Sequence, residues 1–253
     1  MQPKSHFDST PIHNCQVCQK GPLESIIFLG YVPLLNDMAP FNQGLDAEVR
    51  FPVELLRCPH CTLVQIGYAI DPKILFPEDY LYLSGITKAL RDDFADLVRE
   101  VSQLFSLKGL VVDIGANDGS LLIPFREAGY SVVGVEPTKA LERATERGIP
   151  MIKDYFGLEA AQKILSKYGP AQIVTATNIF AHVLQIHEFV EAMLDLLAPE
   201  GIFISESHYV LDLVKTLQYD AVYHDHLKYY SVGSLTRLLE PHGLEIIRVG
   251  RIP

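Results

Sequence analysis

From Gly109 onward the sequence alternates between short apolar strand patterns and amphipathic helical patterns, and this alternation restricts the fold more than any other feature. The stretch GLVVDIGANDGSLLIPFREAGYSVVGVEPT predicts a buried strand at Leu110–Ile114, a glycine turn, a helix and a second buried strand at Ser131–Val135. The alternation continues through PMIKD, LEAAQKILSKY, AQIVTATNIF, IHEFVEAMLDLLA and GIFISES. Strands separated by helices pair in parallel, so we expect an α/β fold with an open, doubly wound sheet.

Polar and glycine residues follow the predicted strands at their carboxyl ends, where sheets of this kind bind ligands. The candidate cofactor-binding residues are Asp113, Gly115, Asn117 and Gly119 after the first strand, Glu136 after the second, Asp154, Tyr155 and Phe156 after the third, and Asn178 after the fourth. The turn DIGANDG is neither G-x-G-x-x-G nor a phosphate loop. A glycine bend preceded by an acid suits a ligand without pyrophosphate, such as S-adenosyl-L-methionine (SAM).

Each strand end has an expected role in holding SAM. The Glu136 carboxylate is placed to accept hydrogen bonds from both ribose hydroxyls. Asp154 is placed to accept a hydrogen bond from the adenine amine, and an aromatic neighbour is placed to stack on the adenine ring. Asn178 is placed to lie beside the methionine part of SAM. The alternatives are NAD(H) as the ligand, or a sheet whose strand-end acids are only solvated caps.

All four cysteines of the chain lie in two C-x-x-C pairs, CQVC at Cys15 and Cys18 and CPHC at Cys58 and Cys61. Two such pairs provide the four thiolates of a tetrahedral Zn2+ site, and four thiolates leave the metal no open position. The sequence therefore predicts a structural zinc that folds the N-terminal part, with His13 and His60 outside the ligand set. The alternatives are a redox dithiol and incidental surface cysteines. A redox pair would usually open a helix in a βαβ unit, and neither pair does so.

The composition argues against two classes of partner. Asp and Glu number 31 against 21 Lys and Arg, so the net charge of −10 repels nucleic-acid backbones and anionic membranes. A local cationic pocket for one phosphorylated metabolite stays open. No apolar run approaches the roughly 18 residues of a membrane span, and the N-terminal MQPKSHFDSTPIHN lacks the apolar stretch of a signal peptide. We expect a cytoplasmic protein with no nucleic-acid or membrane partner.

The patterns divide the chain into three parts. Residues 1–70 form the four-cysteine module, and residues 71–107 form a linking helical segment that contains ITKALRDDFADLVREVSQLF. Residues 108–253 form the SAM-binding core.

The segment YDAVYHDHLKYYS, Tyr219–Ser231, concentrates groups that can exchange protons. It holds four tyrosines, two histidines and two aspartates. Such a set suits removal of a proton and stabilisation of the resulting anion. The alternative is a polar lid whose hydrogen bonds are satisfied internally.

Taken in order, the cysteine pairs, YLYLSGITKAL, DIGANDGSLL, GVEPT, DYFGLEAA, TNIFAHV and YHDHLKYYSVGSLTRLLEPHGLEI resemble the zinc-containing sugar C-methyltransferases from about His13 to the last residue. The resemblance implies a class I methyltransferase fold and a Rossmann-like sheet with a small N-terminal zinc-binding module. It also implies transfer of a methyl group from SAM to a nucleotide-linked keto-deoxysugar, through proton abstraction next to a ketone and an enolate. The nucleotide sugar is the expected partner.

The same resemblance assigns roles within the site. His226 is the expected base, Asp225 an orienting or substrate-binding acid, and Tyr223 a donor to the sugar. Tyr82, which fits the family motif better than Tyr80, and His182 are expected to contact the substrate. We expect His224 to face away and Tyr229 and Tyr230 to form walls.

Two features depart from the family. The motif Tyr-x-Glu-His is here Tyr223-His224-Asp225-His226, with a shorter acid. The family continues past the equivalent of Pro253, and Leu244–Ile252 is predicted as a sixth strand without a seventh to join it to the sheet, so a truncated chain is expected. Competing hypotheses are an O- or N-methyltransferase acting on another small metabolite and an inactive SAM-binding fragment. The oligomeric state stays open.

Overall fold

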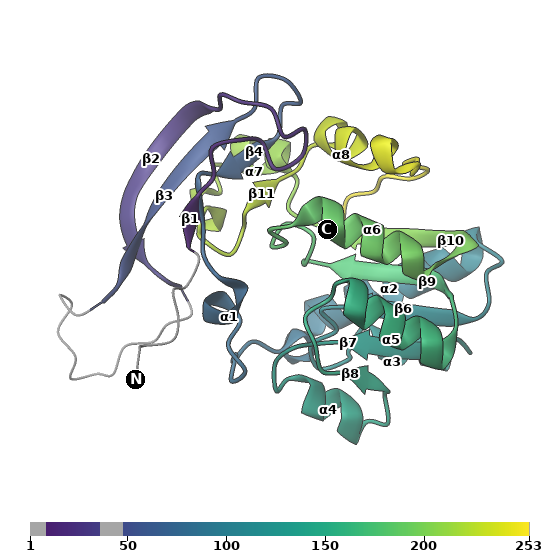
Figure 1. Cartoon of the computed structure of the whole chain (residues 1–253). Helices are drawn as coiled ribbons and strands as arrows, with labels where there is room; N and C mark the ends of the chain where they lie inside the picture. The colour runs from purple at the N-terminus through teal and green to yellow at the C-terminus, as the bar shows by residue number, and fades with distance from the viewer. Residues whose placement is uncertain (1–8, 36–47, 253) are drawn as a thin grey trace. The chain divides into compact units, whose positions relative to one another are not determined.

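The computed structural model describes residues 9–35 and 48–252, and residues 1–8, 36–47 and 253 lie outside the description. The chain folds into two compact units (Figure 1). The cysteine unit comprises residues 1–77, 181–186 and 207–247, and the sheet unit comprises residues 78–180, 187–206 and 248–253.

The sheet unit is built on a five-stranded sheet in which every pair of neighbours is parallel. The strand order is β10-β9-β6-β7-β8. The strands are β6 (Leu110–Ile114), β7 (Ser131–Val135), β8 (Met151–Ile152), β9 (Ala171–Thr177) and β10 (Leu197–Glu206). The chain thus adds strands on one side of β6 and then on the other, which confirms the predicted doubly wound sheet.

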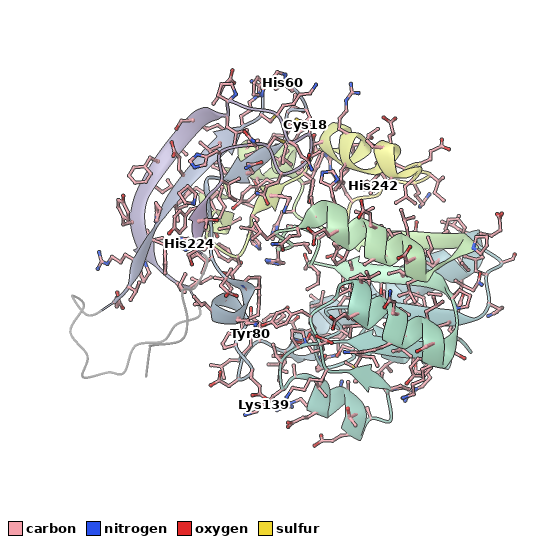
Figure 2. The ribbon with its side chains drawn as sticks, in the orientation of Figure 1. Cys18, His60, Tyr80, Lys139, His224 and His242 are labelled. Atoms are coloured by element: carbon pink, nitrogen blue, oxygen red, sulfur yellow. The ribbon has the colours of Figure 1, made fainter. Side chains whose placement is uncertain are left out.

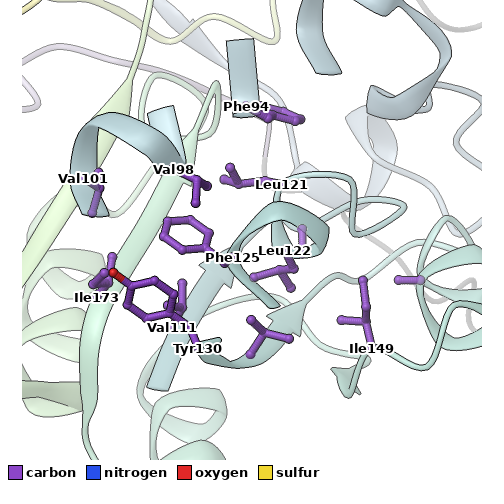
Figure 3. Packing of buried hydrophobic residues seen from close by; sticks show 13 residues of the cluster. Phe94, Val98, Val101, Val111, Leu121, Leu122, Phe125, Tyr130, Ile149 and Ile173 are labelled. Atoms are coloured by element: carbon purple, nitrogen blue, oxygen red, sulfur yellow. The ribbon is translucent and has the colours of Figure 1, made fainter. Parts of the chain in front are cut away.

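Helices alternate with the strands, and all of them except the one at Leu141–Glu146 match the predicted helical patterns. They are α2 (Lys88–Leu104), α3 (Leu122–Glu127), α4 (Leu141–Glu146), α5 (Leu158–Tyr168) and α6 (Ile186–Leu196), with a 3-10 turn η2 (Ser84–Ile86) before α2. In Figure 1, α5 and α6 lie in front of the sheet. The opposite face is covered by α2 and α3, whose Phe94, Val98 and Phe125 pack against Val111 and Ile173 of the strands (Figure 3).

The cysteine unit contains two antiparallel sheets. One pairs β1 (Thr10–Pro11) with β5 (Tyr68–Ala69), and the other has the order β11-β4-β3-β2. Its strands are β2 (Glu24–Pro33), β3 (Arg50–Arg57), β4 (Val64–Ile66) and β11 (Lys228–Tyr229). The remaining elements in the described part of this unit are α1 (Pro72–Leu75), α7 (Val210–Thr216), η3 (Tyr219–Ala221), α8 (Val232–Leu239) and η4 (Glu240–His242).

The division of the chain differs from the one drawn from the sequence. Residues 207–247 were assigned to the SAM-binding core, whereas the structure groups them with the cysteine unit. The reason is long-range pairing: Lys228 and Tyr229 of β11 pair with Gln65 and Val64 of β4. Apolar periodicity within residues 207–247 carries no information about that partner.

The predicted sixth strand at Leu244–Ile252 is wrong. These residues have no regular secondary structure, and Ile247, Val249 and Ile252 are exposed. A strand needs a hydrogen-bonded neighbour, and an apolar pattern alone does not provide one. Instead Arg248 forms an ion pair with Glu100 of α2. No helix in the described part of the chain is long and apolar enough to cross a membrane.

Candidate functional site

The glycine turn after β6 has the backbone shape that the sequence predicted. Gly115, Asn117 and Gly119 all have positive φ angles, of 71°, 50° and 76°. A side chain at position 115 would collide with Ile179, so glycine is required there for both conformation and space. Because the sheet is parallel, this turn and the residues after β7, β8 and β9 lie at one edge of the sheet unit.

Glu136 is the organising carboxylate of this edge. It is buried and accepts hydrogen bonds from the backbone N–H of Asn117 at 3.0 Å and from the N–H and hydroxyl of Thr138 at 2.9 and 2.6 Å. A carboxylate has about four acceptor positions, so one position stays open for a ligand hydroxyl. The predicted ribose contact stays a prediction, and the structure adds that Glu136 also fixes the glycine turn.

Asp113 at the end of β6 is buried in the sheet unit. Burial raises the pKa of its carboxyl group to about 7, while the hydrogen bond from the Thr175 hydroxyl at 2.6 Å opposes that rise and the Glu136 charge adds to it. A nearby positive charge would therefore stabilise the ionised form of the Asp113 carboxyl group.

The other strand-end candidates have partners within the sheet unit. Asp154 is ion-paired to Lys163 at 2.7 Å, and Phe156 packs edge-on against Phe189 with ring centroids 5.1 Å apart. Asn178 is exposed, has a φ angle of 55° and donates from Nδ2 to Glu206 at 2.9 Å. Tyr155 is 39% exposed. Their contacts with adenine and methionine stay predictions.

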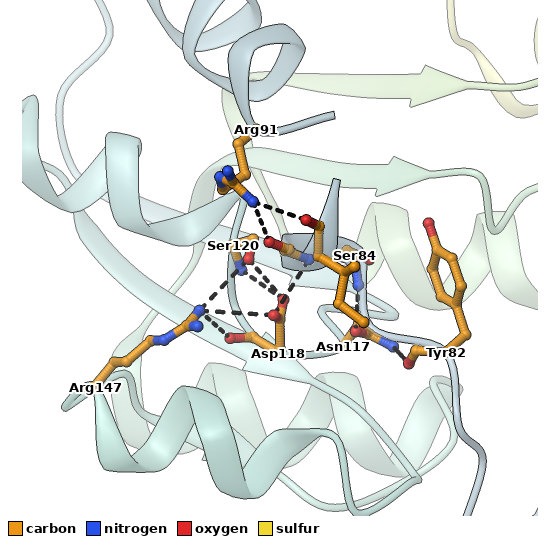
Figure 4. Close-up of polar contacts among 9 residues, drawn as sticks. Tyr82, Ser84, Arg91, Asn117, Asp118, Ser120 and Arg147 are labelled. Carbon is orange, nitrogen blue, oxygen red and sulfur yellow. Dashed lines mark hydrogen bonds and ion pairs between the residues drawn. The ribbon is translucent and has the colours of Figure 1, made fainter. Parts of the chain in front are cut away.

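Asn117 holds the segment 82–86 against the glycine turn (Figure 4). Its side-chain oxygen accepts from the Ser84 N–H at 2.9 Å and its amide donates to the Tyr82 carbonyl at 3.0 Å. The backbone of Tyr82 is thereby fixed, while its side chain is 53% exposed. The predicted cofactor residue Asn117 therefore also positions a predicted substrate residue.

Sequence reasoning missed Asp118, which makes a second connection to the same segment. Its buried carboxylate accepts from the Gly85 N–H at 3.2 Å and from the Ser120 hydroxyl at 2.7 Å, with Arg147 3.7 Å away. A side chain at position 85 would collide with Asp118 and Ser120, so glycine is needed there. The D-x-S spacing within the turn is the signal that could have identified Asp118, because such acids commonly bond the backbone two residues on.

The segment Tyr219–Ser231 lies in the cysteine unit, and its His226 is nine-tenths buried. Its Nδ1 lies 2.8 Å from the Ala221 carbonyl and its Nε2 lies 3.2 Å from the Tyr223 hydroxyl. A carbonyl only accepts, so Nδ1 carries the proton and Nε2 offers the lone pair, which accepts from Tyr223. The imidazole is therefore held as a neutral base with Nε2 as its basic atom.

Two further histidines contact this ring. The centroid of His182 lies 5.0 Å and that of His208 4.6 Å from the centroid of His226. The pKa of His226 is lowered to about 4, chiefly by burial and also by the neighbouring charges of His182 and His208, while the Ala221 hydrogen bond opposes the shift. His182 was predicted to contact the substrate, which stays a prediction, and its Nδ1 donates to the Asp225 carbonyl at 2.6 Å. His208, whose pKa burial also lowers, was missed because it lies outside the motif.

The remaining residues of the segment separate into two groups. Asp225 is buried, as are Tyr229 and Tyr230, and the Tyr229 hydroxyl donates to the Ala221 carbonyl at 3.2 Å. His224 instead reaches β3, where its Nε2 donates to the Phe51 carbonyl at 3.3 Å. It thus contacts a different part of the unit, as expected for a residue facing away from the base.

The four cysteines converge as predicted. Their sulfur atoms all lie within 4.8 Å of one another, with Cys15 and Cys61 3.4 Å apart and Cys18 and Cys58 3.5 Å apart. These contacts join the two knuckles rather than the members of one C-x-x-C pair, and all four thiols are free. In a tetrahedral zinc site with Zn–S distances of about 2.3 Å, the sulfur atoms are slightly farther apart than the two closest pairs here. The separations of the four sulfur atoms therefore span the value that zinc needs, and the donor set fits this metal. His60 is exposed at the outer end of the second knuckle (Figure 2).

The comparisons with known proteins match both parts of the chain. A family model for a methyltransferase domain matches residues 86–249, and one for a zinc binding domain matches residues 15–76. The chain belongs to the methyltransferase domain family. The methyltransferase match includes the glycine turn, Glu136 and His226, so both clusters of polar residues lie within the matched region.

Individual relatives agree with this family. The chain is 34% identical over 242 residues to the C-methyltransferase NovU of Streptomyces niveus, which covers 94% of this chain and 57% of that protein. It is 29% identical over 99 residues to a ubiquinone biosynthesis O-methyltransferase of Caulobacter sp. (strain K31), covering 37% of this chain and 38% of that one. A SAM-dependent methyltransferase from Archaeoglobus fulgidus superposes with a TM-score of 0.51 at 19% identity, covering 60% of this chain and 68% of that one, and supports the class I fold.

We predict that Cys58→Ser removes the bound zinc and unfolds the cysteine unit, because structural zinc contributes on the order of 10 kcal/mol. Elemental analysis of anaerobically purified protein, with circular dichroism, measures both effects. His60→Ala, a change at an exposed residue of the same knuckle, is the control and should keep its zinc. Wild-type protein purified without zinc but fully folded would contradict the prediction.

We predict that Glu136→Gln weakens SAM binding roughly 10- to 100-fold, because it replaces a charged acceptor whose hydrogen bonds contribute about 1.5–3 kcal/mol. Titration calorimetry measures the affinity, and Glu142→Gln, which removes the same charge from an exposed position on α4, is the control. If both variants bound SAM as the wild type does, Glu136 would act only in shaping the turn.

We predict that acid destabilises the cysteine unit partly through His226. The ordinary pKa of histidine is 6.5 and that of folded His226 is about 4, so the unfolded chain binds the proton more readily between these values. The contribution of neutral His226 to the free energy of unfolding is therefore fully present above pH 6.5, and it falls by roughly 3 kcal/mol as the pH drops to about 4. Thermal unfolding at pH 7 and pH 4.5 should show a smaller acid shift for His226→Asn than for the wild type. The control His60→Asn should show the same acid shift as the wild type. If His226→Asn also showed that shift, this role of His226 would be excluded.

Proposed function

We propose that this chain is a SAM-dependent C-methyltransferase that acts on a nucleotide-linked keto-deoxysugar. The observation that carries the proposal is the state of His226, a buried neutral imidazole whose Nε2 lone pair is oriented by the Nδ1 hydrogen bond to Ala221. Methylation at carbon requires such a base, because the hydrogen next to a ketone is only weakly acidic.

The chain's own residues supply proton removal. His226 Nε2 accepts the proton from the substrate carbon, and the C–H electron pair becomes part of an enolate. The substrate carbon would then form the new bond to the methyl group, whose bond to sulfur would break with its electron pair staying on sulfur. The Tyr223 hydroxyl, which donates to Nε2 in the structure, is available to turn to the substrate oxygen and stabilise its negative charge. Asp225 and His182 are proposed to orient the base and the sugar.

The sheet unit is proposed to hold the cofactor. SAM, when bound, supplies a methyl group on a positively charged sulfur. The residues proposed to hold it are Asp113, Gly115, Asn117, Gly119, Glu136, Asp154, Tyr155, Phe156 and Asn178, with Tyr82 close to the reaction. The cationic cofactor would favour the ionised form of Asp113, whose charge burial otherwise opposes.

The comparisons support methyl transfer to carbon over transfer to oxygen or nitrogen. The C-methyltransferase matches along 94% of this chain, whereas the O-methyltransferase matches along 37%. The nucleotide sugar rests on the resemblance of the motifs. We also propose that the protein works in the cytoplasm, where its four free thiols stay reduced.

We predict that His226→Asn slows methyl transfer by roughly 10²–10⁴-fold, the usual contribution of a general base. SAM affinity should stay near that of the wild type, because His226 is not among the residues proposed to hold SAM. Rates and SAM affinity are measured together, with His224→Asn as the matched control from the same motif. Near-normal turnover in His226→Asn would remove it from the mechanism.

The reaction type is tested separately by solvent exchange. Candidate nucleotide keto-sugars are first selected by thermal shift with SAM, and each is then incubated with the chain in D2O without SAM. Deuterium entering at the carbon next to the ketone supports C-methylation, since that route passes through an enolate. Methyl transfer to oxygen without any exchange would favour the O-methyltransferase alternative.

A further inference from the structure

Gln65 is a residue of β4 whose polar side chain is fully buried and contacts the first cysteine knuckle. Its side-chain oxygen accepts from the backbone N–H of Gln16 at 2.9 Å, and its amide donates to the Asn14 carbonyl at 3.4 Å. Gln16 lies between Cys15 and Cys18, so Gln65 fixes the knuckle backbone to the strand that follows the second knuckle. A buried amide is retained at such a site because its hydrogen bonds are satisfied.

The Leu227 carbonyl is the point where this network reaches the base. It accepts from the Ile66 N–H of β4 at 3.1 Å and from the Gln16 side-chain amide at 3.4 Å. Leu227 directly follows His226. Two hydrogen bonds, one from β4 and one from the first knuckle, therefore end on the carbonyl of the residue that directly follows His226.

A second histidine is tied to the same strand. The buried Lys228, opposite Gln65 in the register of β11 and β4, donates from Nζ to the Val183 carbonyl. Val183 directly follows His182, whose ring contacts His226. The residues after both histidines are therefore anchored to β11, and β11 is anchored to the cysteine knuckles.

We propose that the four-cysteine centre is a positioning device for the base, and that Gln16 and Gln65 are the positioning residues that connect it to His226. Zinc would hold the two knuckles in one arrangement, the knuckles would fix β4, and β4 with Gln16 would fix the Leu227 peptide. The catalytic consequence rests on the proposed function, whereas the mechanical connection does not.

The connection is tested by the tautomer of His226, read from the ring-nitrogen chemical shifts of 15N-histidine-labelled protein. Wild-type protein with zinc should show Nδ1 protonated, as the Ala221 hydrogen bond requires. Gln16→Met should shift the His226 signals toward a mixture of tautomers while zinc content and SAM affinity stay unchanged. Lys20→Met, at an exposed residue of the same knuckle, should leave the signals as in the wild type.

Three further measurements complete the test. Gln16→Asn, whose shorter side chain does not span to Leu227, should behave as Gln16→Met does if the long amide is what matters. Zinc removal from the wild type with a chelator, followed by zinc addition, should disperse and then restore the His226 signals. In turnover, loss of one hydrogen bond should slow proton removal by roughly 2- to 10-fold.

The outcomes separate this proposal from the proposed function. Unchanged His226 signals in both Gln16 variants and in the zinc-free protein would overturn the positioning role, even if His226 is the base. Shifted signals together with normal turnover in His226→Asn would support the mechanical connection and reject the proposed function instead.

Discussion

The pairing of β11 with β4 is the interaction on which the rest of the structure depends. It joins only Lys228 and Tyr229 to Gln65 and Val64, yet it brings a segment from near the end of the described chain into the unit that holds the cysteines. A two-residue ladder is weak alone, since backbone hydrogen bonds each contribute about 1 kcal/mol. Here it is reinforced by hydrogen bonds to the Leu227 carbonyl and by burial of the flanking tyrosines. The acid–base cluster therefore has a rigid support although it lies in irregular chain.

Burial disfavours the charged form of a key side chain in each of the two polar clusters, and the consequence differs between the basic His226 and the acidic Asp113. Removing His226 from water disfavours its charged form, so the ring stays neutral and keeps its lone pair over the physiological pH range. Removing Asp113 from water likewise disfavours its charge, but a carboxyl group then becomes a ready partner for a cation. The neutral imidazole suits the proposed role of His226 as a base, and the buried carboxyl group suits the proposed contact of Asp113 with a positively charged cofactor. The same physical cause thus suits the proposed proton removal in one unit and the proposed cofactor recognition in the other.

The polar residues at the strand ends have structural duties as well as proposed ligand contacts. Glu136 holds the glycine turn, Asn117 holds the backbone of Tyr82, and Asp118 holds that of Gly85. Left-handed turns and buried carboxylates are unfavourable unless such bonds satisfy them. Once the bonds are made, the turn has little freedom left to lose when a ligand binds, which improves affinity. A residue predicted only as a cofactor contact therefore acts earlier, by shaping the site before the cofactor arrives.

The sequence by itself determined the elements whose signal is local. The bounds of β6, β7 and α5, the glycine turn and the meeting of two C-x-x-C pairs all follow from periodicity or spacing within short stretches. Only the tertiary structure placed residues 207–247 with the cysteine unit, added His208 to the His226 cluster and left Leu244–Ile252 without strand structure. The reason is that a periodic pattern reports which side chains prefer burial, but not which distant segment buries them. That choice depends on hydrogen bonds and packing between residues far apart in the chain, and these exist only once the chain has folded.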